Sequence, residues 1–357
     1  MNVYKERAIN LQMRGDNMGV YKASSLKELL SKEVLSNVVG DIKNMKIYRI
    51  DTSGLSGSKM YKLKIYNNES SKILYLKVNN LKEDWLARVS NDSGRELTVF
   101  KDSIFAKIEE FIKGIYIAYY EDRNCYAILM NDMSSFIGAE KNSDDYYAYL
   151  DNLAKFHAKF SEYDILKYKS LLSVEDYYYF LTEEKLDQVE EFKEDNYYGW
   201  KKLKEFLGEE RYKKYCEFKN IDQKFSYYPK TFVHGDYRPD NALYIGKDDV
   251  RFIDWANSGC GPCTLDLFWY IMSSVDNKVD KIDLIYYYKE SLEKYLGYAF
   301  TKKTWDTLIR IGVLCACRMF LAALISRSNL DDKFATYNLQ WWIESLIIIL
   351  DDLEIER

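Results

Sequence analysis

The stretch from Thr231 to Trp255 constrains the fold of this chain more than any other. It places strands in a half of the sequence that otherwise favours helices. TFV ends at His234-Gly235, and a loop then leads to ALYIG and VRFID, two short runs of strand-forming residues. GKDD, between these runs, has the composition of a tight turn. The two runs therefore predict a hairpin, which would return the chain so that its two outer ends lie side by side.

Three polar residues stand at the ends of this predicted hairpin. Asp236 follows the first strand, Asn241 comes five positions later, and Asp254 ends VRFID. Phosphoryl transfer needs a carboxylate to accept the proton of the attacking hydroxyl, and an amide oxygen with a second carboxylate to hold magnesium on the nucleotide phosphates. The spacing His-x-Asp-x-x-x-x-Asn is that of the protein-kinase catalytic loop. We expect His234 to anchor the loop with its side chain in the core, and not to act as a base.

The motifs HGDYRPDN, FIDW and GPCTLDL together closely resemble those of the aminoglycoside phosphotransferase and choline kinase superfamily. That family has HGD in place of the kinase HRD, and I-D-W or I-D-F in place of DFG. Ala256 stands at the glycine position of DFG, which favours the small-molecule branch. The resemblance implies that Asp236 is the catalytic base, that Asn241 and Asp254 bind magnesium, and that Asp266 supports the catalytic loop.

The resemblance also implies a fold, an α+β bilobal protein-kinase-like architecture. A chain of 357 residues is long enough for two units at roughly 150 residues per domain. We expect an N-terminal nucleotide-binding lobe over residues 1–130, built on a small antiparallel sheet. The mainly helical C-terminal lobe, residues 131–357, would carry the catalytic hairpin and the substrate pocket, with a helical insert at about residues 160–230.

The first lobe should begin with helices and continue as a sheet. The first forty residues look helical and polar, and MKIYRID, MYKLKIY and KILYLKV read as three strands of an antiparallel meander. Apolar residues spaced from Leu97 to Phe111 predict one amphipathic helix over residues 93–111. YIAYY and NCYAILM then return to strand character.

A lysine at the end of the third strand supports the nucleotide-binding interpretation. Lys77 is the last residue but one of KILYLKV, and a lysine on an apolar strand needs an anionic partner. We expect Glu96 to be its ion-pair partner, with Glu109 and Glu110 as competitors. The AILMNDMS segment would supply the adenine pocket through Met130 and Met133, although a structural core strand explains the same residues equally well.

A phosphate-covering loop is expected between the first two strands. Ser53, Gly54, Ser56 and Gly57 lie there, and such small residues let backbone N–H groups approach phosphate. An ordinary hairpin turn would have much the same composition.

The expected reaction is transfer of the γ-phosphoryl group of ATP, or of GTP, to a hydroxyl of a small molecule, with magnesium bound. Aminoglycoside-, choline- and sugar-like acceptors all remain open. The alternative is a catalytically silent scaffold of kinase fold, such as a spore-coat-type protein. The complete set of Asp236, Asn241, Asp254 and Lys77 argues against that alternative.

Composition excludes other classes of partner. The net charge of −5 argues against nucleic-acid binding, which normally requires a basic face. The N-terminus has no apolar run of signal-peptide length, and SLIIIL near the end is too short to span a bilayer. We therefore expect a cytoplasmic protein without a membrane span, whose six cysteines are reduced.

The cysteines offer two further hypotheses. Cys260-Gly261-Pro262-Cys263 has the form of a thioredoxin dithiol, but its Gly-Pro matches the kinase-like turn and Asp254 already ends the strand before it. The same pair could bind zinc together with Cys315 and Cys317. A C-x-C pair in an apolar helical run is more simply explained by core packing. His157, on the apolar face of LAKFHAKF, is likewise expected in the core.

Overall fold

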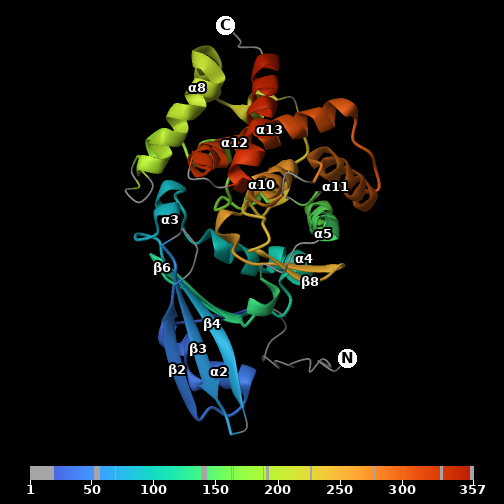
Figure 1. The fold of residues 1–357 in the computed structure, drawn as a ribbon. Helices are drawn as coiled ribbons and strands as arrows, with labels where there is room; N and C mark the ends of the chain where they lie inside the picture. The colour runs from blue at the N-terminus through green and yellow to red at the C-terminus, as the bar shows by residue number, and fades with distance from the viewer. Residues whose placement is uncertain are drawn as a thin grey trace.

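The computed structural model describes residues 20–51, 57–68, 70–137, 143–161, 163, 165–187, 189, 193–225, 227–275, 279–329 and 333–353. A twisted sheet with short helices forms one end of the molecule, and a group of helices forms the other (Figure 1). The expected α+β bilobal architecture is confirmed.

The sheet end is built from the first part of the chain. Its elements are β1 (Tyr21–Ala23), α1 (Leu26–Leu29), α2 (Lys32–Val39), β2 (Asn44–Ile50), β3 (Lys59–Tyr66), β4 (Ser71–Asn80), α3 (Trp85–Val89), η1 (Arg95–Phe100), α4 (Asp102–Ile112), β5 (Tyr116–Glu121) and β6 (Cys125–Asn131). The strand order is β1-β5-β6-β4-β3-β2, and all neighbours are antiparallel except β1 and β5. The predicted meander is therefore present, but the sheet is mixed and larger than three strands.

Period-two alternation decides which face of the sheet is covered. Leu63, Leu74 and Leu76 are buried on one face, where they pack with Leu29 and Leu35 of α1 and α2. Tyr75 and Lys77, which alternate with Leu74 and Leu76 along β4, point to the opposite face. The covered face forms a core of its own, and the opposite face is left for the catalytic half.

The prediction of one continuous helix over residues 93–111 is wrong, because the structure has two separate helical segments there. Lys101 has extended backbone angles (φ −76°, ψ 132°), which separate the 3₁₀ segment η1 from α4. Arg95 and Glu96 both lie in η1, before this break. The prediction of helices throughout the first forty residues is also incomplete, because β1 precedes α1 and residues 1–19 lie outside the described residues. α3 was not predicted at all.

The second part of the chain is mainly helical, as expected. Its elements are η2 (Ser134–Phe136), α5 (Ser143–Phe160), η3 (Ile165–Lys167), α6 (Val174–Tyr178), α7 (Glu183–Leu186), α8 (Lys193–Glu217), α9 (Ile221–Lys224), β7 (Thr231–Val233), β8 (Ala242–Gly246), β9 (Asp249–Phe252), η5 (Trp255–Asn257), β10 (Gly259–Gly261), α10 (Thr264–Ser274), α11 (Lys281–Leu296), α12 (Lys302–Asn329) and α13 (Lys333–Asp352). β8 and β9 form the predicted hairpin, and β7 pairs with β10.

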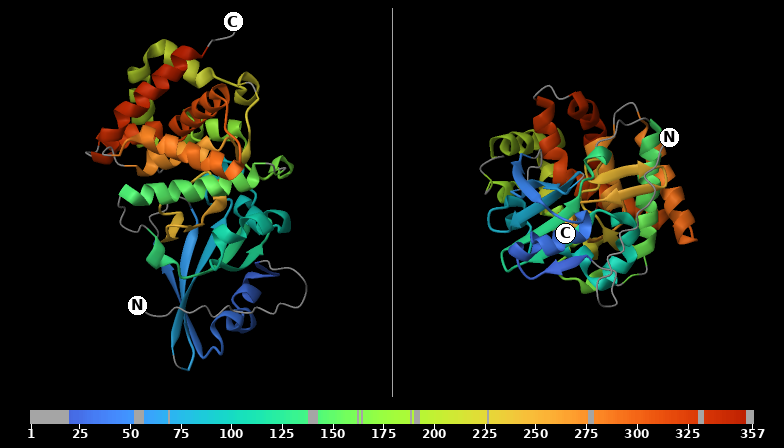
Figure 2. Two further views of the ribbon diagram at one scale, coloured as in Figure 1. Left: turned by 90° about the vertical axis from the view of Figure 1, so that its right-hand side faces the viewer. Right: turned by 90° about the horizontal axis from the view of Figure 1, so that it is seen from below.

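One large apolar cluster joins the two parts. In side view α5 crosses the molecule between the sheet and the C-terminal helices (Figure 2). Ile104 and Phe111 of α4 and Ile128 of β6 belong to the same buried cluster as Leu150 of α5 and Phe252 of β9. The division near residue 130 stays a prediction, because this core continues across it.

α12 is the one helix within the described ranges that is long and apolar enough to cross a membrane. Of its most apolar window, 78% is buried inside the protein, which is the pattern of a core helix. The sequence analysis considered only SLIIIL near the end of the chain, whereas the run from Ile311 to Ile325 in α12 is longer and its one charged residue is Arg318. Arg318 is buried and donates to the carbonyl oxygen of Tyr178 at 3.2 Å.

Candidate active site

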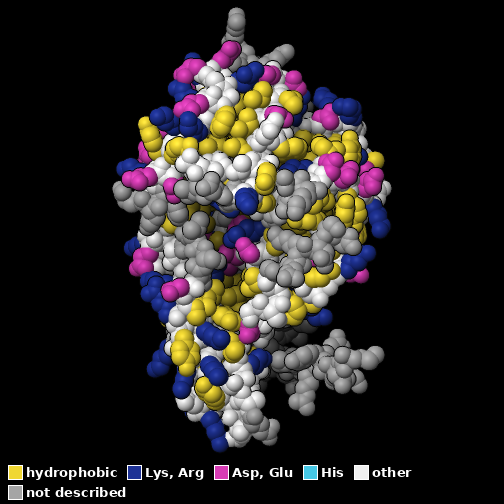
Figure 3. Space-filling model, in the orientation of Figure 1, with side chains coloured by type: hydrophobic (Ala, Val, Ile, Leu, Met, Phe, Trp, Pro, Cys, Tyr) yellow, Lys and Arg dark blue, Asp and Glu magenta, His cyan; other side chains and the backbone are white. Residues whose placement is uncertain are grey.

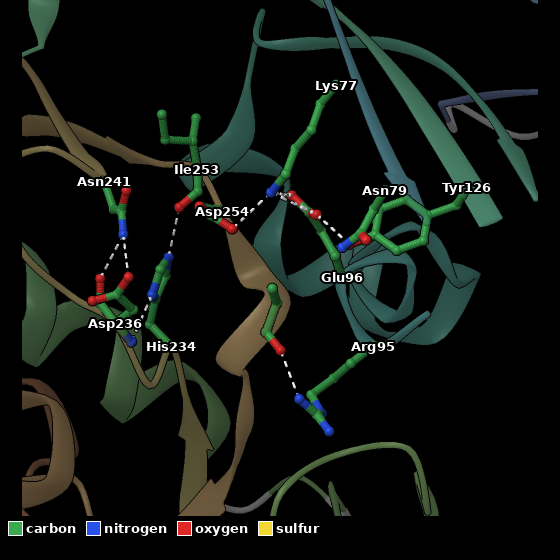
Figure 4. Close-up of polar contacts among 11 residues, drawn as sticks. Lys77, Asn79, Arg95, Glu96, Tyr126, His234, Asp236, Asn241, Ile253 and Asp254 are labelled. Atoms are coloured by element: carbon green, nitrogen blue, oxygen red, sulfur yellow. Dashed lines mark hydrogen bonds and ion pairs between the residues drawn. The ribbon is translucent and has the colours of Figure 1, made fainter. Parts of the chain in front are cut away.

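Lys77 connects three segments that are far apart in the sequence. It lies near the end of β4, in the middle of the sheet, and is only 6% exposed. Its Nζ lies 2.9 Å from Oε2 of Glu96 on η1 and 2.8 Å from Oδ1 of Asp254, two residues after β9 (Figure 4). Of the competing acids, Glu110 instead pairs with Lys155 and Lys159 on α5. The structure therefore contains the Lys77–Glu96 pair.

The charge on Lys77 is maintained by its neighbours. Burial alone would lower the pKa of Lys77, but the carboxylates of Asp254 and Glu96 raise it above its ordinary value. Burial raises the pKa of Glu96, while the ammonium of Lys77 opposes that rise. Lys77 therefore stays cationic at neutral pH and presents a positive charge to the cavity.

Two residues missed by the sequence analysis hold Glu96 from behind. The hydroxyl of Tyr126 donates to Oε2 of Glu96 at 2.8 Å, and Nδ2 of Asn79 donates to that hydroxyl at 3.0 Å (Figure 4). Asn79 lies two residues after Lys77 on β4, and Tyr126 is its cross-strand partner on β6. The register of β4 against β6, once known, would have identified Asn79 and Tyr126 as neighbours of Lys77.

A third residue missed by the sequence analysis, Arg95, fastens η1 to the segment after Asp254. The buried guanidinium donates from Nη1 to the carbonyl oxygen of Ala256 at 2.7 Å and from Nε to that of Ser170 at 3.0 Å. Arg95 thereby positions its neighbour Glu96, since both sit on the same turn of η1. No local sequence pattern signals this contact.

Asp236 lies in the loop between β7 and β8 with three hydrogen-bonding or ionic neighbours. Its Oδ1 accepts from Nε1 of Trp269 on α10 at 2.8 Å, and its Oδ2 accepts from Nδ2 of Asn241 at 2.8 Å. Nε of Arg238 lies 3.3 Å from Oδ1. Burial raises the pKa of Asp236 to about 6, although the charge of Arg238 lowers it in part. The carboxylate is thus oriented, and it ionises close to neutral pH.

Asp266 holds the backbone that carries Asp236. Its two carboxylate oxygens accept the backbone N–H groups of His234 and Gly235, each at 2.7 Å. Gly235 has a φ of 78°, and a Cβ there would lie 2.0 Å from the carbonyl oxygen of Asn257. The loop therefore requires glycine at this position. Asp266 also lies 3.0 Å from Nε2 of His157, which is fully buried behind the loop.

His234 joins the loop to the hairpin. The side chain is buried, and its Nε2 donates to the carbonyl oxygen of Ile253 at 2.9 Å (Figure 4). Burial lowers the pKa of His234, so the imidazole remains neutral. Because His234 precedes Asp236 and Ile253 precedes Asp254, this bond fixes the distance between the two aspartates.

Asp254 and Asn241 could together bind a magnesium ion that also binds a nucleotide. The Asp254 side chain is 40% exposed, whereas Glu96 beside it is only 1% exposed, so Asp254 alone of the two is open to a ligand. Burial alone would raise the pKa of Asp254, but Lys77 lowers it below its ordinary value. Asn241 uses its amide nitrogen toward Asp236, which leaves its oxygen for a cation.

This oxygen donor set fits Mg²⁺, which binds proteins through one or two carboxylates and takes its remaining ligands from phosphate and water. Within the described ranges, no group of three or more His, Cys, Asp and Glu residues could hold a metal ion by itself. The site therefore suits a metal that arrives with a phosphate ligand.

Of the remaining predicted nucleotide contacts, the three that the structure describes, Gly57, Met130 and Met133, do not line the cavity beside Asp236. Ser53, Gly54 and Ser56 lie outside the described residues. Gly57 is described, and a Cβ on it would lie 2.7 Å from Cα of Asp84. Met130 is half-buried on β6 and Met133 precedes η2, and neither residue lines the cavity beside Asp236. Their role in nucleotide binding stays a prediction.

A cavity of about 590 Å³ adjoins Asp236, Asp254 and Lys77. Its other walls come from α3, the 180–186 segment, the start of α8, α10 and α12. Figure 3 shows this face of the molecule, on which charged side chains of both signs meet in the hollow between the sheet end and the helical end. The catalytic candidates therefore face a space large enough for a small molecule.

The thiol hypotheses have no geometric support. All six cysteines are described, and none forms a disulfide. Cys260, Cys263, Cys315 and Cys317 are buried, and burial raises the pKa of Cys263 to about 12, whereas a redox-active thiol needs a lowered pKa. The GPC turn instead leads into α10, which carries Asp266.

Comparison with known families agrees with the site. Residues 132–298 match the model of the phosphotransferase enzyme family (APH), a segment that contains Asp236, Asn241, Asp254 and Asp266. The resemblance drawn from the motifs is thus confirmed, and it supports small-molecule phosphotransferase chemistry. No curated protein matches the chain significantly.

Several solved structures are similar at low identity. A thermostable mutant of aminoglycoside phosphotransferase APH(4)-Ia is 10% identical with a TM-score of 0.44, covering 90% of this chain and 98% of its own. Plasmodium vivax ethanolamine kinase is 12% identical with a TM-score of 0.46, covering 85% and 83%. Choline kinase from Cryptosporidium parvum Iowa II is 12% identical with a TM-score of 0.45, covering 87% and 90%. At these scores the similarities add nothing to the assignment of function.

Proposed function

We propose that this protein transfers the γ-phosphoryl group of ATP, or of GTP, to a hydroxyl of a small molecule. The observation that carries the proposal is that Asp236, Asp254 and Lys77, from three segments, line one cavity, and that Asn241 donates to Asp236 beside it. A surface hairpin with unrelated acids would have no reason to bury a lysine beside one of them.

Asp236 is proposed as the base that orients the acceptor hydroxyl and takes its proton. Trp269 and Asn241 each donate to one of its oxygens, so the carboxylate has a fixed direction. A pKa of about 6 leaves most of Asp236 ionised at pH 7 while keeping it basic enough to accept a proton.

Asn241 and Asp254 are proposed to hold Mg²⁺, which neutralises charge on the nucleotide phosphates when it is bound. Lys77 supplies a further positive charge at the same place, and Glu96 keeps it there. The remaining contribution is positioning, since the reaction needs no covalent enzyme intermediate.

The test is a thermal-shift titration with ATP and with GTP, each with and without magnesium. Wild type, Asp254→Ala and the control Asp248→Ala would be compared, since Asp248 lies exposed in the turn of the same hairpin. Nucleotide at about 100 times its dissociation constant adds about 2.7 kcal/mol of apparent stability. We expect a magnesium-dependent shift in wild type and Asp248→Ala that is lost in Asp254→Ala.

An absence of stabilisation by either nucleotide would contradict the proposal and favour a kinase-fold scaffold. A shift retained in full by Asp254→Ala would place the nucleotide elsewhere.

A further inference from the structure

The backbone of Asp254 has an uncommon conformation. Its φ of 63° and ψ of 70° place it in the left-handed region, which residues other than glycine adopt only where their surroundings hold them. Asp254 lies between β9 and η5, so this conformation turns the chain from the hairpin into the 3₁₀ segment. The direction of its carboxylate, which meets Lys77, therefore depends on contacts that keep the backbone in place.

Two buried donors hold the carbonyl oxygens that follow Asp254. Nη1 of Arg95 donates to the carbonyl oxygen of Ala256 at 2.7 Å (Figure 4), and the hydroxyl of Tyr177 donates to that of Asn257. Arg95 is 2% exposed and Tyr177 is 1% exposed, so both bonds form away from water, where they are electrostatically stronger. The main chain is thus fixed within three residues of Asp254.

Arg95 also ties this segment to two others. Its Nη2 donates to the carbonyl oxygen of Ser90 at 3.0 Å, and its Nε donates to that of Ser170 at 3.0 Å. Ser90 and Ala256 line the cavity whereas Arg95 does not, so the guanidinium lies behind the cavity wall. A planar guanidinium can donate to three carbonyl groups in fixed directions, whereas the ammonium group of a lysine is a compact point charge.

One short segment holds Asp254 through both its side chain and its backbone. Glu96 pairs with Lys77, whose Nζ lies 2.8 Å from Oδ1 of Asp254. Arg95, the residue before Glu96 in η1, holds the carbonyl oxygen of Ala256, two residues after Asp254. These contacts form a closed ring, in which a shift of η1 would move the carboxylate and the backbone of Asp254 together.

We propose that Arg95, assisted by Tyr177, is a positioning residue for magnesium. By holding the main chain after Asp254, Arg95 keeps the partly exposed carboxylate in place for a magnesium ion. The inference rests on the proposed function, in which Asp254 binds magnesium together with the nucleotide. Residues that orient a metal ligand from behind typically contribute about 10- to 100-fold to metal affinity.

The test measures how much magnesium the nucleotide site needs. Binding of a fluorescent methylanthraniloyl derivative of ATP or of GTP, whichever nucleotide wild type binds, is titrated on the full chain over a range of magnesium concentrations. Arg95→Met removes the guanidinium and keeps an unbranched side chain. We expect the magnesium concentration for half-maximal strengthening of binding to rise about tenfold in this variant. Nucleotide affinity without magnesium should stay near the wild-type value.

Arg88→Met is the matched control. Arg88 is exposed on α3, and its Nη1 donates to the carbonyl oxygens of Lys82 at 3.1 Å and Glu83 at 2.9 Å. The control therefore removes arginine–carbonyl bonds that do not involve the segment after Asp254, and its magnesium requirement should equal that of wild type. An unchanged requirement in Arg95→Met would overturn the proposal, because a residue that only stabilises the fold alters the unfolding temperature and not the magnesium requirement.

Two further variants decide the matter if Arg95→Met does not fold. Tyr177→Phe removes only the hydroxyl that holds Asn257, and it should raise the magnesium requirement several-fold. Arg95→Lys keeps a positive donor without the planar fork, and it should also raise the requirement, by less than the loss of the charge would. A wild-type requirement in both variants would overturn the proposal.

The wild-type titration separates this inference from the proposed function. Nucleotide binding that magnesium does not strengthen in wild type would overturn the proposed metal site itself. A magnesium effect in wild type that persists unchanged in Arg95→Met would overturn the positioning role of Arg95 alone.

Discussion

The indole nitrogen of Trp269 donates a hydrogen bond to Oδ1 of Asp236 at 2.8 Å, from a helix that begins 28 residues after the aspartate. This bond stabilises the ionised carboxylate and lowers its pKa against the effect of burial. It also selects the direction of the carboxylate, whose other oxygen is held by Asn241. Trp269 is therefore a positioning residue for the proposed base.

Trp269→Phe keeps the aromatic ring and removes the donor. We expect the pKa of Asp236 to rise, which moves the acidic limb of the kcat profile to higher pH, and kcat at pH 7 to fall about tenfold or more because general-base catalysis contributes about 10²- to 10⁴-fold. The KM for the nucleotide should not change. Trp341→Phe, on α13, serves as the control, and an unshifted profile in Trp269→Phe would count against the positioning role.

The pH dependence of wild-type turnover follows from the same carboxylate. Since the pKa of Asp236 is about 6, the base is protonated below that pH and ionised above it. kcat/KM measured from pH 4.5 to 8 should fall about tenfold per pH unit below about pH 6 and level off above it. A profile that is flat across pH 6 would contradict the assignment of Asp236 as the base.

Asp236→Asn should stabilise the fold at neutral pH. The pKa of Asp236 is raised from 3.8 to about 6 on folding, so between these values the folded state holds a proton that the unfolded chain has lost, and stability falls as the pH rises through this window. Removal of the charge should add about 1 to 3 kcal/mol to the free energy of unfolding at pH 8.

The gain should disappear near pH 4, which urea unfolding at the two pH values would show. Asp248→Asn, in the exposed turn of the hairpin, should show no such gain. A loss of stability at pH 8 in Asp236→Asn would show that the lost ionic contacts outweigh the relief of burial.

Tyr126→Phe tests the support behind Glu96. The variant removes the hydrogen bond to Glu96 and leaves Nδ2 of Asn79 without its acceptor, which should cost about 1 to 3 kcal/mol in the free energy of unfolding. Tyr120→Phe, on β5 beside β6, is the control. A double variant that adds Asn79→Ala should cost less than the sum of the two single changes, because both changes remove the same Asn79–Tyr126 bond. Additive costs would mean that the two residues act independently.

Gly235→Ala tests the catalytic loop. The left-handed φ of 78° and the contact of a new Cβ with the carbonyl oxygen of Asn257 should together cost at least about 2 kcal/mol. Gly246→Ala, where a Cβ meets nothing within 4 Å, should leave stability nearly unchanged. Thermal unfolding of the two variants measures the difference, and similar midpoints would show that the loop can relax.

Local sequence patterns were sufficient to predict which residues come together where those residues are close in the chain. The β8–β9 hairpin returns Asp254 toward Asn241 within fourteen residues, so its strand and turn residues predict the meeting. The apolar period from Leu97 to Phe111 correctly predicted burial, since both ends are buried in one core. It did not reveal the break at Lys101, because the same residues are buried whether the helix is continuous or not.

The sequence by itself determined the chemical groups, their order, and the short-range elements that carry them, including Asp236, Asn241, Asp254 and Lys77. Tertiary structure alone decided the pKa of Asp236, the support of Glu96 by Tyr126, and the set of residues that lines the cavity. Local propensity and spacing act over a few residues and can be read along the chain. Burial and electrostatic shifts arise only when α3, α10 and α12 pack around one space, and no single segment encodes that packing.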